Sequence, residues 1–306
     1  MEFSHRPVLL EETIAALDIK PDGIYVDGTA GGAGHSLEKA KRLKNGFLYA
    51  LDRDPDAVKT ASERLKGLPA KVIQSNFRDM DTVLAAEGVD KVNGILLDLG
   101  VSSYQLDSAE RGFSYRKDAP LDMRMSKTGL SAADIVNTYS AEQLTDIFKK
   151  YGEEKFAYRI ANRIAAERAE KPILSTVQLA DIIASSVPAA ARRDGHPARK
   201  CFQAIRIAVN GELESLEEAL DKAFGLLCKD GVLAIITFHS LEDRMVKQKF
   251  KEYCTGCICP PDFPVCVCGR TPAGRPATRK PVEPDIKELE ENPRSRSAKL
   301  RAVIKN

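Results

Sequence analysis

A glycine-rich segment between two acidic residues is the part of this sequence best suited to bind a small molecule. The segment runs from Asp27 to His35 as Asp-Gly-Thr-Ala-Gly-Gly-Ala-Gly-His, and Asp52 follows after a further apolar run. Glycines allow a sharp turn and a close approach to a ligand, although such turns also serve packing alone. An acidic residue about twenty residues beyond the turn is suited to accept hydrogen bonds from two ribose hydroxyls. These residues predict a ligand that contains a nucleoside.

The order of residues in this segment discriminates between nucleoside ligands. No Gly-Lys-Ser/Thr follows the glycines, which excludes a Walker loop. A dinucleotide site would have the pattern G-x-G-x-x-G, with a helix N-terminus facing the pyrophosphate. A carboxylate at Asp27 repels a pyrophosphate but tolerates the amino group of a methionine moiety. The segment therefore favours S-adenosylmethionine over NAD.

Short apolar runs and amphipathic stretches alternate around these residues. We expect helices at 35–43 and 56–65, and strands at 24–26, 46–52, 71–74 and 94–98. Strands that are apolar throughout and separated by helices predict a parallel sheet covered on both faces. Asp27, Asp52 and Asp98 close predicted strands, and Gln105 follows the last of them. Because ligands of open α/β sheets bind beyond the carboxyl ends of the strands, we expect these four side chains to converge.

The second half of the chain has a different pattern. Residues 131–227 are helical in pattern almost throughout, with capping-box sequences at Ser140–Gln143 and Ser175–Gln178. A further apolar strand follows at 231–238, and the alternating residues 299–304 predict an edge strand.

The simplest arrangement is a helical domain inserted between two strands of one sheet. We expect residues 1–111 and 206–306 to form the sheet domain, and residues 112–205 to form the helical insertion.

Motifs spread in order along nearly the whole chain resemble one protein family. They are HRPVLLEE (5–12), DGTAGGAGHS (27–36), LDRDP (51–55), GILLDLGVSS (94–103), ERGFS (110–114), PLDMRM (120–125), FQAIRIAVN (202–210), FHSLEDR (238–244) and NPRSRS (292–297). The chain is similar to the RsmH family, also called MraW. This resemblance implies a class I S-adenosylmethionine-dependent methyltransferase: an α/β protein with a Rossmann-like doubly wound sheet and an inserted all-helical domain. It implies methyl transfer to N4 of a cytidine in the decoding region of 16S ribosomal RNA.

The resemblance also assigns residues to the cofactor. Those that match the family's cofactor contacts are Ala33, Gly34, His35, Asp52, Phe77, Asp98 and Gln105. The residues themselves leave other roles open. Phe77 could be part of the core, Gln105 a turn residue, and His35 a hydrogen-bonding group at a helix start.

The target amine needs help from the enzyme because the N4 lone pair of cytosine is delocalised into the ring. A group that accepts hydrogen bonds from N4 turns the lone pair toward the methyl group. Many amino-methyltransferases use Asp/Asn-Pro-Pro-aromatic after the fourth strand, whereas this chain has Asp-Leu-Gly-Val. Our hypothesis is that Asp98, Ser102, Ser103 or a backbone carbonyl is the acceptor and that Asp98 is the catalytic residue, shared with the cofactor.

Aromatic and imidazole groups are candidates for the pocket of the target base. Tyr104 or Phe238 could stack on the base, and His239 at the end of the fifth parallel strand could line the pocket. Alternatively, His239 and Ser240 satisfy backbone groups at a helix start, with Ser240 as N-cap and Asp243 three residues on.

The overall charge excludes a general polycation, since 46 Lys and Arg balance 44 Asp and Glu to a net +2. Basic residues nevertheless cluster at 192–200 and 270–280. These clusters could contact RNA phosphates, or they could be ordinary solvated charge. The target cytidine must be unstacked to react, which predicts an accessible or single-stranded RNA. The N-terminus has no signal-peptide pattern and no apolar run could span a membrane, so we expect a cytoplasmic protein that acts on the small ribosomal subunit.

Five of the seven cysteines lie between Cys254 and Cys268 in the pattern C-x2-C-x-C-x6-C-x-C. Two interpretations of this cluster remain open, a zinc-binding loop and free or redox-labile thiols. No metal is assigned to the predicted active site. Two further alternatives also stay open: methylation of DNA or protein, and a ribosome assembly factor without essential catalysis. The oligomeric state is open as well, a homodimer being one option.

Overall fold

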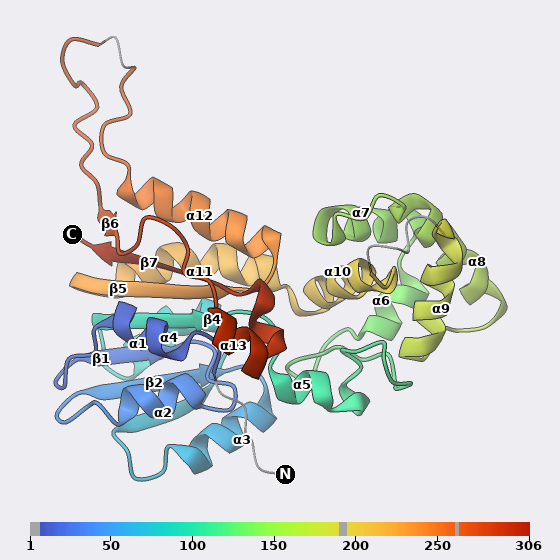
Figure 1. The fold of residues 1–306 in the computed structure, drawn as a ribbon, viewed down its shortest axis with the longest axis horizontal. Coiled ribbons are helices and arrows are strands. Elements are labelled where there is room, and N and C mark those ends of the chain that lie inside the picture. The colour runs from blue at the N-terminus through green and yellow to red at the C-terminus, as the bar shows by residue number, and fades with distance from the viewer. Residues whose placement is uncertain (1–6, 190–194, 261–262) are drawn as a thin grey trace. The chain divides into compact units, whose positions relative to one another are not determined.

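The computed structural model describes residues 7–189, 195–260 and 263–306. The chain forms two compact units (Figure 1). The first, here called the sheet unit, combines the chain up to Gly100 with Glu214–Asn306, and the second, the helical unit, is Val101–Leu213. The expected insertion at 112–205 lies inside the helical unit, which extends beyond both predicted boundaries.

A seven-stranded sheet forms the centre of the sheet unit, in the order β3-β2-β1-β4-β5-β7-β6. The strands are β1 (Ile24–Asp27), β2 (Phe47–Asp52), β3 (Ala70–Gln74), β4 (Val92–Asp98), β5 (Leu227–Thr237), β6 (Gly274–Pro276) and β7 (Lys299–Lys305). β1 to β5 pair in parallel, and β7 pairs antiparallel with β5 and with β6. This arrangement confirms the predicted class I methyltransferase fold.

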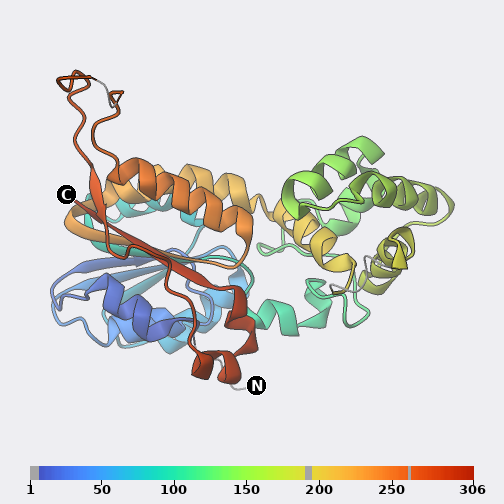
Figure 2. The same ribbon diagram turned by 45° about the horizontal axis from the view of Figure 1, so that its top comes forward.

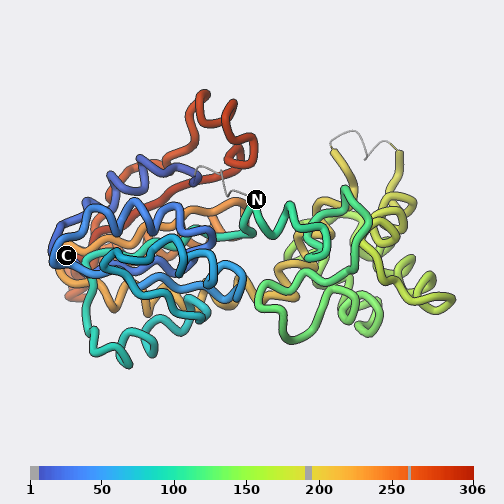
Figure 3. The backbone as a smooth tube through the Cα atoms, turned by 90° about the horizontal axis from the view of Figure 1, so that it is seen from below, coloured from blue at the N-terminus to red at the C-terminus, as the bar shows by residue number. Residues whose placement is uncertain are grey.

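Helices cover both faces of this sheet. They are α1 (Leu10–Leu17), α2 (Gly34–Ala40), α3 (Pro55–Arg64), α4 (Met80–Ala86), α11 (Glu212–Leu226), α12 (Ser240–Cys254) and α13 (Ile286–Glu291), with 3-10 turns η1 (Phe77–Asp79) and η4 (Pro293–Ser297). Alternate residues of β2 point to opposite faces: Leu48 packs with Ala61 of α3, whereas Leu51 packs with Leu84 of α4. Figure 3 shows α1 and α4 on opposite sides of the sheet. The inner strands β1, β2 and β4 are largely buried on both faces, which explains their uninterrupted apolar sequences.

The prediction of an edge strand at 299–304 was wrong. β7 lies inside the sheet, because Gly274–Pro276 pairs with its last residues on the side away from β5. The three residues of β6 are too short, and too rich in glycine and proline, to carry a strand signal in the sequence.

The helical unit is built from α5 (Ser103–Asp107), α6 (Ala132–Thr138), α7 (Ala141–Gly152), α8 (Ala157–Glu170), α9 (Thr176–Ser186) and α10 (Ala198–Asn210), with the 3-10 turn η2 (Ala109–Arg111). One apolar core joins them and includes Phe148, Ile164 and Ile205. The predicted capping box at Ser140–Gln143 is present. Ser175 also caps its helix, by accepting from the backbone N–H of Gln178. The two capping signals thus located the starts of α7 and α9.

Candidate functional site

Three acidic residues mark the carboxyl ends of adjacent strands, as the sequence predicted. Asp27 ends β1, Asp52 ends β2 and Asp98 ends β4. Because β1 lies between β2 and β4, the three residues follow one edge of the parallel sheet. This is the edge at which open α/β sheets bind ligands.

The carboxylate of Asp27 is paired with side chains of α2 rather than left available to a ligand. Its Oδ2 accepts hydrogen bonds from Lys39 Nζ at 2.8 Å and from Ser36 Oγ at 2.6 Å, and all three side chains are buried. Burial opposes ionisation of Asp27, yet Lys39 and Ser36 together hold its pKa below the usual value. The argument that a free Asp27 charge selects the cofactor was therefore wrong, since Lys39 neutralises that charge. Ser36 and Lys39 were missed, although their i, i+3 spacing places both on one face of α2.

The glycine turn is held by Asp52. The backbone N–H of Gly31 donates to Asp52 Oδ2 at 2.7 Å, and the N–H of Asp54 donates to Oδ1 at 2.8 Å. Burial raises the pKa of Asp52 to about 6, and these two N–H groups oppose the rise. A carboxylate has about four acceptor positions, so each oxygen can accept one more hydrogen bond. Asp52 can accordingly shape the turn and accept ribose hydroxyls at the same time.

Ala33 and Gly34 form the junction between the turn and α2. Ala33 is the N-cap of α2 and has φ +60°, in the left-handed region. A Cβ on Gly34 would lie 2.3 Å from Cγ of Pro7, so this position admits no side chain without a shift of the N-terminal segment. The backbone groups of Ala33 are already paired, since its N–H donates to the carbonyl of Ala30 and its carbonyl accepts from the N–H of Leu37.

His35 is buried and neutral. Its Nε2 lies 3.0 Å from the carbonyl oxygen of Val8, and a carbonyl only accepts, so Nε2 carries the proton. Burial lowers the pKa of His35 to about 4, and Lys39 lowers it further. The lone pair of Nδ1 is then directed to the other side of the ring, where Asp98 Oδ2 lies 3.6 Å away. The position of the ring thus favours a protonated Asp98.

Asp98 is the most perturbed acid at this edge. Burial and, to a smaller extent, the nearby carboxylate of Asp27 raise the pKa of Asp98 to about 8. Its Oδ1 is buried and has no hydrogen-bond partner among the described residues. A buried, unpartnered carboxyl oxygen is costly unless a donor or a cation reaches it. The site therefore fits a ligand that carries positive charge, as S-adenosylmethionine does.

Phe77 begins η1 directly after β3 and is half-buried against the core on the α4 side of the sheet. It also adjoins the glycine turn, since a Cβ on Gly28 would lie 2.9 Å from Cβ of Phe77. The core role and the predicted position beside the cofactor are thus compatible.

Phe238 and His239 follow β5 at the same edge. The side chain of His239, and not that of Ser240, caps α12 by accepting from the backbone N–H of Glu242, so the expected Ser240–Asp243 cap was wrong. The buried carboxylate of Glu242 accepts from the N–H groups of Phe238 and His239. The Phe238 ring lies 3.4 Å from the position of a Cβ on Gly100, whose φ is +102°. Glu242 was missed as an organiser of this loop because a buried carboxylate has no distinct sequence signal.

The remaining predicted residues belong to the helical unit. Ser102 caps α5 by accepting from the N–H of Gln105, whose side chain accepts in return from the N–H of Ser102. Gln105 is buried, Ser103 opens the helix, and Tyr104 is 36% exposed. Ser102 and Gln105 therefore lie together in a capping box, and the expected convergence of Gln105 with Asp98 stays a prediction.

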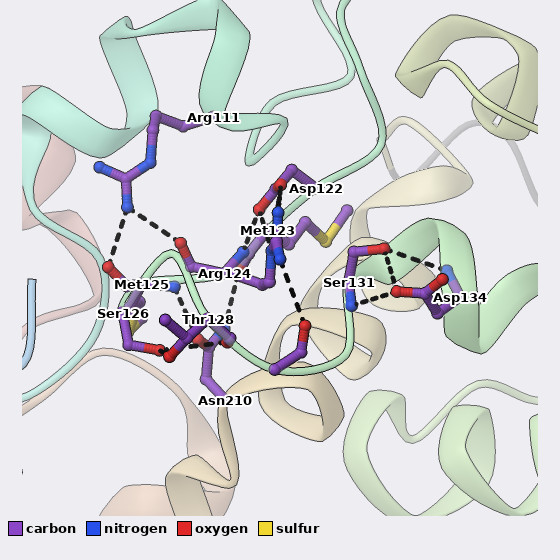
Figure 4. Close-up of polar contacts among 11 residues, drawn as sticks. Arg111, Asp122, Met123, Arg124, Met125, Ser126, Thr128, Ser131, Asp134 and Asn210 are labelled. Carbon is purple, nitrogen blue, oxygen red and sulfur yellow. Dashed lines mark hydrogen bonds and ion pairs between the residues drawn. The ribbon is translucent and has the colours of Figure 1, made fainter.

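Three of the sequence motifs meet in a polar network of the helical unit (Figure 4). Asn210 at the end of α10 donates to the carbonyl of Met123 at 2.8 Å and accepts from the N–H of Met125 at 2.9 Å. Arg111 Nη2 donates to the carbonyls of Arg124 and Met125. Met123 has φ +61°, a strained value for a long side chain. The side chains of Arg111 and Asn210 thus hold the backbone of the loop 120–130, an organisation that the motifs alone did not reveal.

A model of the MraW methylase family matches residues 2–306. The chain belongs to this family. Proteins called ribosomal RNA small subunit methyltransferase H are close relatives. The one from Clostridium botulinum (strain Loch Maree) is 54% identical over 308 residues, with both chains fully covered. The one from Lachnospira eligens is 55% identical over 306 residues, covering 98% of this chain and 97% of that one.

Membership of this family confirms two predictions, a class I methyltransferase and S-adenosylmethionine as methyl donor. Of the helices that the structure describes, none is long and apolar enough to cross a membrane.

Proposed function

We propose that this methylase transfers a methyl group to N4 of a cytidine in the decoding region of 16S ribosomal RNA, acting in the cytoplasm on the small subunit. The observation that carries the proposal is the full-length identity of 54% to proteins named ribosomal RNA small subunit methyltransferase H. The choice of cytidine N4 comes from the sequence resemblance and is the finer part of the proposal.

The cofactor contacts that we propose are those of the sequence prediction: Ala33, Gly34, His35, Asp52, Phe77, Asp98 and Gln105. Asp52 would accept the ribose hydroxyls with the acceptor positions left after Gly31 and Asp54. Asp98 would meet positive charge with its unpartnered Oδ1. When bound, the cofactor supplies an electrophilic methyl group on a sulfonium sulfur.

Asp98 is the residue that we propose to act on the target amine. A cation at this edge stabilises the ionised form of Asp98, which then accepts a hydrogen bond from N4 and orients its lone pair. The methylated amine has one proton in excess, which it loses readily to a nearby acceptor or to water. Because the lone pair of His35 Nδ1 faces Asp98 and favours its protonated form, this ionisation depends on the bound cation.

The target-base pocket is proposed to include Phe238 and His239 from the loop after β5, and Ser102 and Ser103 from the start of α5. The loop after β5 is rigid because Glu242 fixes two of its N–H groups. A preorganised loop of this kind avoids reorganisation during the reaction.

The helical unit is proposed to recognise RNA. Arg199 and Lys200 at the start of α10 are exposed, and His196 beside them stacks on Tyr115 with ring centroids 4.6 Å apart. Arg192 and Arg193, which belong to the same predicted basic stretch, lie outside the described residues. In the tail, Arg275 already pairs with Asp230, whereas the side chains of Arg279 and Lys280 are exposed. The exposed charge near α10 and that of Arg279 and Lys280 in the tail are both candidates for phosphate contacts.

The test is methyl transfer from labelled S-adenosylmethionine to small subunits from a strain that lacks the enzyme, with nuclease mapping of the label. We expect label on one cytidine and none after Asp98→Ala, while Glu63→Ala, an exposed acid on α3, keeps full activity. Label in protein or DNA would overturn the RNA proposal. Binding of cofactor without any label would favour an assembly factor, and full activity of Asp98→Ala would overturn the role of Asp98.

A further inference from the structure

Four cysteines that the methylation site does not use converge in the loop between α12 and β6. The Sγ atoms of Cys257, Cys259, Cys266 and Cys268 all lie within 4.8 Å of one another. Two separations are 3.5 Å, between Cys266 and Cys268, and 3.8 Å, between Cys257 and Cys268. We propose that these four sulfurs bind one zinc ion in a tetrahedral structural site.

The separations fit a single ion. Zinc–sulfur bonds of about 2.3 Å in a tetrahedron place the sulfurs about 3.8 Å apart. The observed sulfur–sulfur separations are too long for a disulfide, whose sulfurs lie about 2.05 Å apart. All seven cysteines are free. A mononuclear thiolate site is the arrangement that these distances describe, and zinc is the common ion for four cysteine ligands.

Backbone N–H groups support the sulfurs as they do around metal-bound thiolates. The N–H of Cys259 donates to Sγ of Cys257 at 3.4 Å, and the N–H of Val267 donates to Sγ of Cys259 at 3.3 Å. Such hydrogen bonds stabilise negative charge on sulfur and orient the ligands before the ion arrives.

The fifth cysteine of the sequence cluster is separate. Cys254 is the last residue of α12 and packs, half-buried, against the core of the sheet unit. Without Cys254, the five clustered cysteines leave four, which matches the four ligands of a tetrahedral zinc ion. These four form two C-x-C pairs, one on each arm of the loop.

The loop needs a cross-link because it has little apolar core. In Figures 1 and 2 its two arms leave α12 and β6 and extend side by side away from the sheet. Ile258, Val265 and Val267 are 60%, 70% and 73% exposed. At the base, the N–H of Ala273 donates to the carbonyl of Tyr253. Small segments without a core are commonly held by a metal ion or disulfide, and zinc would hold the arms beyond this base.

The first measurement is the metal content of the full-length protein, purified without chelator and without added metal. Mass spectrometry with inductively coupled plasma should find about one zinc per chain. Zinc below about a tenth of an equivalent would overturn the proposal, as would iron at one equivalent or a disulfide among these cysteines in the non-reduced protein.

Three variants locate the ion within the chain. The double variant Cys257→Ser/Cys268→Ser should lose the zinc, whereas Cys254→Ser and Cys228→Ser should keep it. Retention of zinc by the double variant would overturn the ligand assignment. If the double variant fails to fold, the test is the absorption spectrum of the wild-type protein with zinc exchanged for cobalt. Thiolate-to-cobalt charge-transfer bands together with the intense visible bands of a tetrahedral ion would support the site. The spectrum of an octahedral ion would overturn it.

Discussion

Charge is unevenly distributed among the acids at the carboxyl edge of the sheet. Asp27 is ionised against Lys39, whereas Asp98 holds a proton at neutral pH because its pKa is about 8. A ligand cation beside Asp98 favours the ionised form, so that binding of the cation and loss of the proton are linked. The pH dependence of this protein should therefore report on Asp98.

The first prediction concerns cofactor affinity. Below pH 8, S-adenosylmethionine must displace the proton of Asp98, so its affinity should rise by up to about tenfold per pH unit between pH 6 and 8 and then level off. Isothermal titration calorimetry in two buffers of different ionisation enthalpy measures both the affinity and the proton released. Asp98→Asn should remove this slope, and an unchanged slope in that variant would refute the assignment.

The second prediction concerns stability without cofactor. Because the pKa of Asp98 is higher in the folded than in the unfolded chain, the folded state binds the extra proton, and stability falls as pH rises from about 4 to 8. Asp98→Asn should thus raise the melting temperature more at pH 8 than at pH 5 by differential scanning calorimetry. An equal shift at both pH values would contradict the raised pKa.

At the scale of elements, α2 is tied to β1 through the buried pair of Lys39 and Asp27. Lys39→Met leaves an uncompensated buried carboxylate and should lower the free energy of unfolding by about 3–5 kcal/mol. The double variant Asp27→Asn/Lys39→Met should recover much of this loss in urea denaturation. Lys41→Met, at the exposed C-cap of the same helix, should change the free energy of unfolding by less than about 1 kcal/mol.

The loop 120–130 offers a matched test in the helical unit. Asn210→Ala leaves the N–H of Met125 and the carbonyl of Met123 without their partner and should cost about 2–3 kcal/mol. Asn162→Ala on the exposed surface of α8 should stay within about 0.5 kcal/mol. Equal losses in chemical denaturation would show that the network of Figure 4 does not stabilise the loop.

The elements also explain what could be predicted from the sequence. The strands β1, β2 and β4 were found because burial on both faces produces uninterrupted apolar runs, and their acidic ends marked the ligand edge. The partners of those acids were not found, since Lys39 is ordinary in a helix sequence and is buried only once β1 and α2 pack together. Likewise β6, with three residues, is defined by pairing with β7 rather than by its own sequence.

At the scale of the whole molecule, RNA affinity should depend on the helical unit. Arg199→Ala/Lys200→Ala should weaken binding to small subunits and reduce the slope of log affinity against log salt by about 1.4–1.8, or 0.7–0.9 per lost phosphate contact. Filter binding at several salt concentrations measures this slope. Lys41→Ala, on the sheet unit, should leave it unchanged, and an unchanged slope in the double variant would remove α10 from the RNA surface.

The discontinuity of the sheet unit has a consequence for how the chain folds. β4 and β5 are neighbours in the sheet, yet the whole of Val101–Leu213 separates them in sequence. The helices α7, α8 and α9 each pack on the next along the chain, so this part of the helical unit can become compact early, whereas the β4–β5 ladder requires the closure of a long loop. An insert that has already collapsed shortens that loop. The unit proposed to recognise the substrate would then also act as an internal folding aid, and substitutions in its core should slow completion of the sheet.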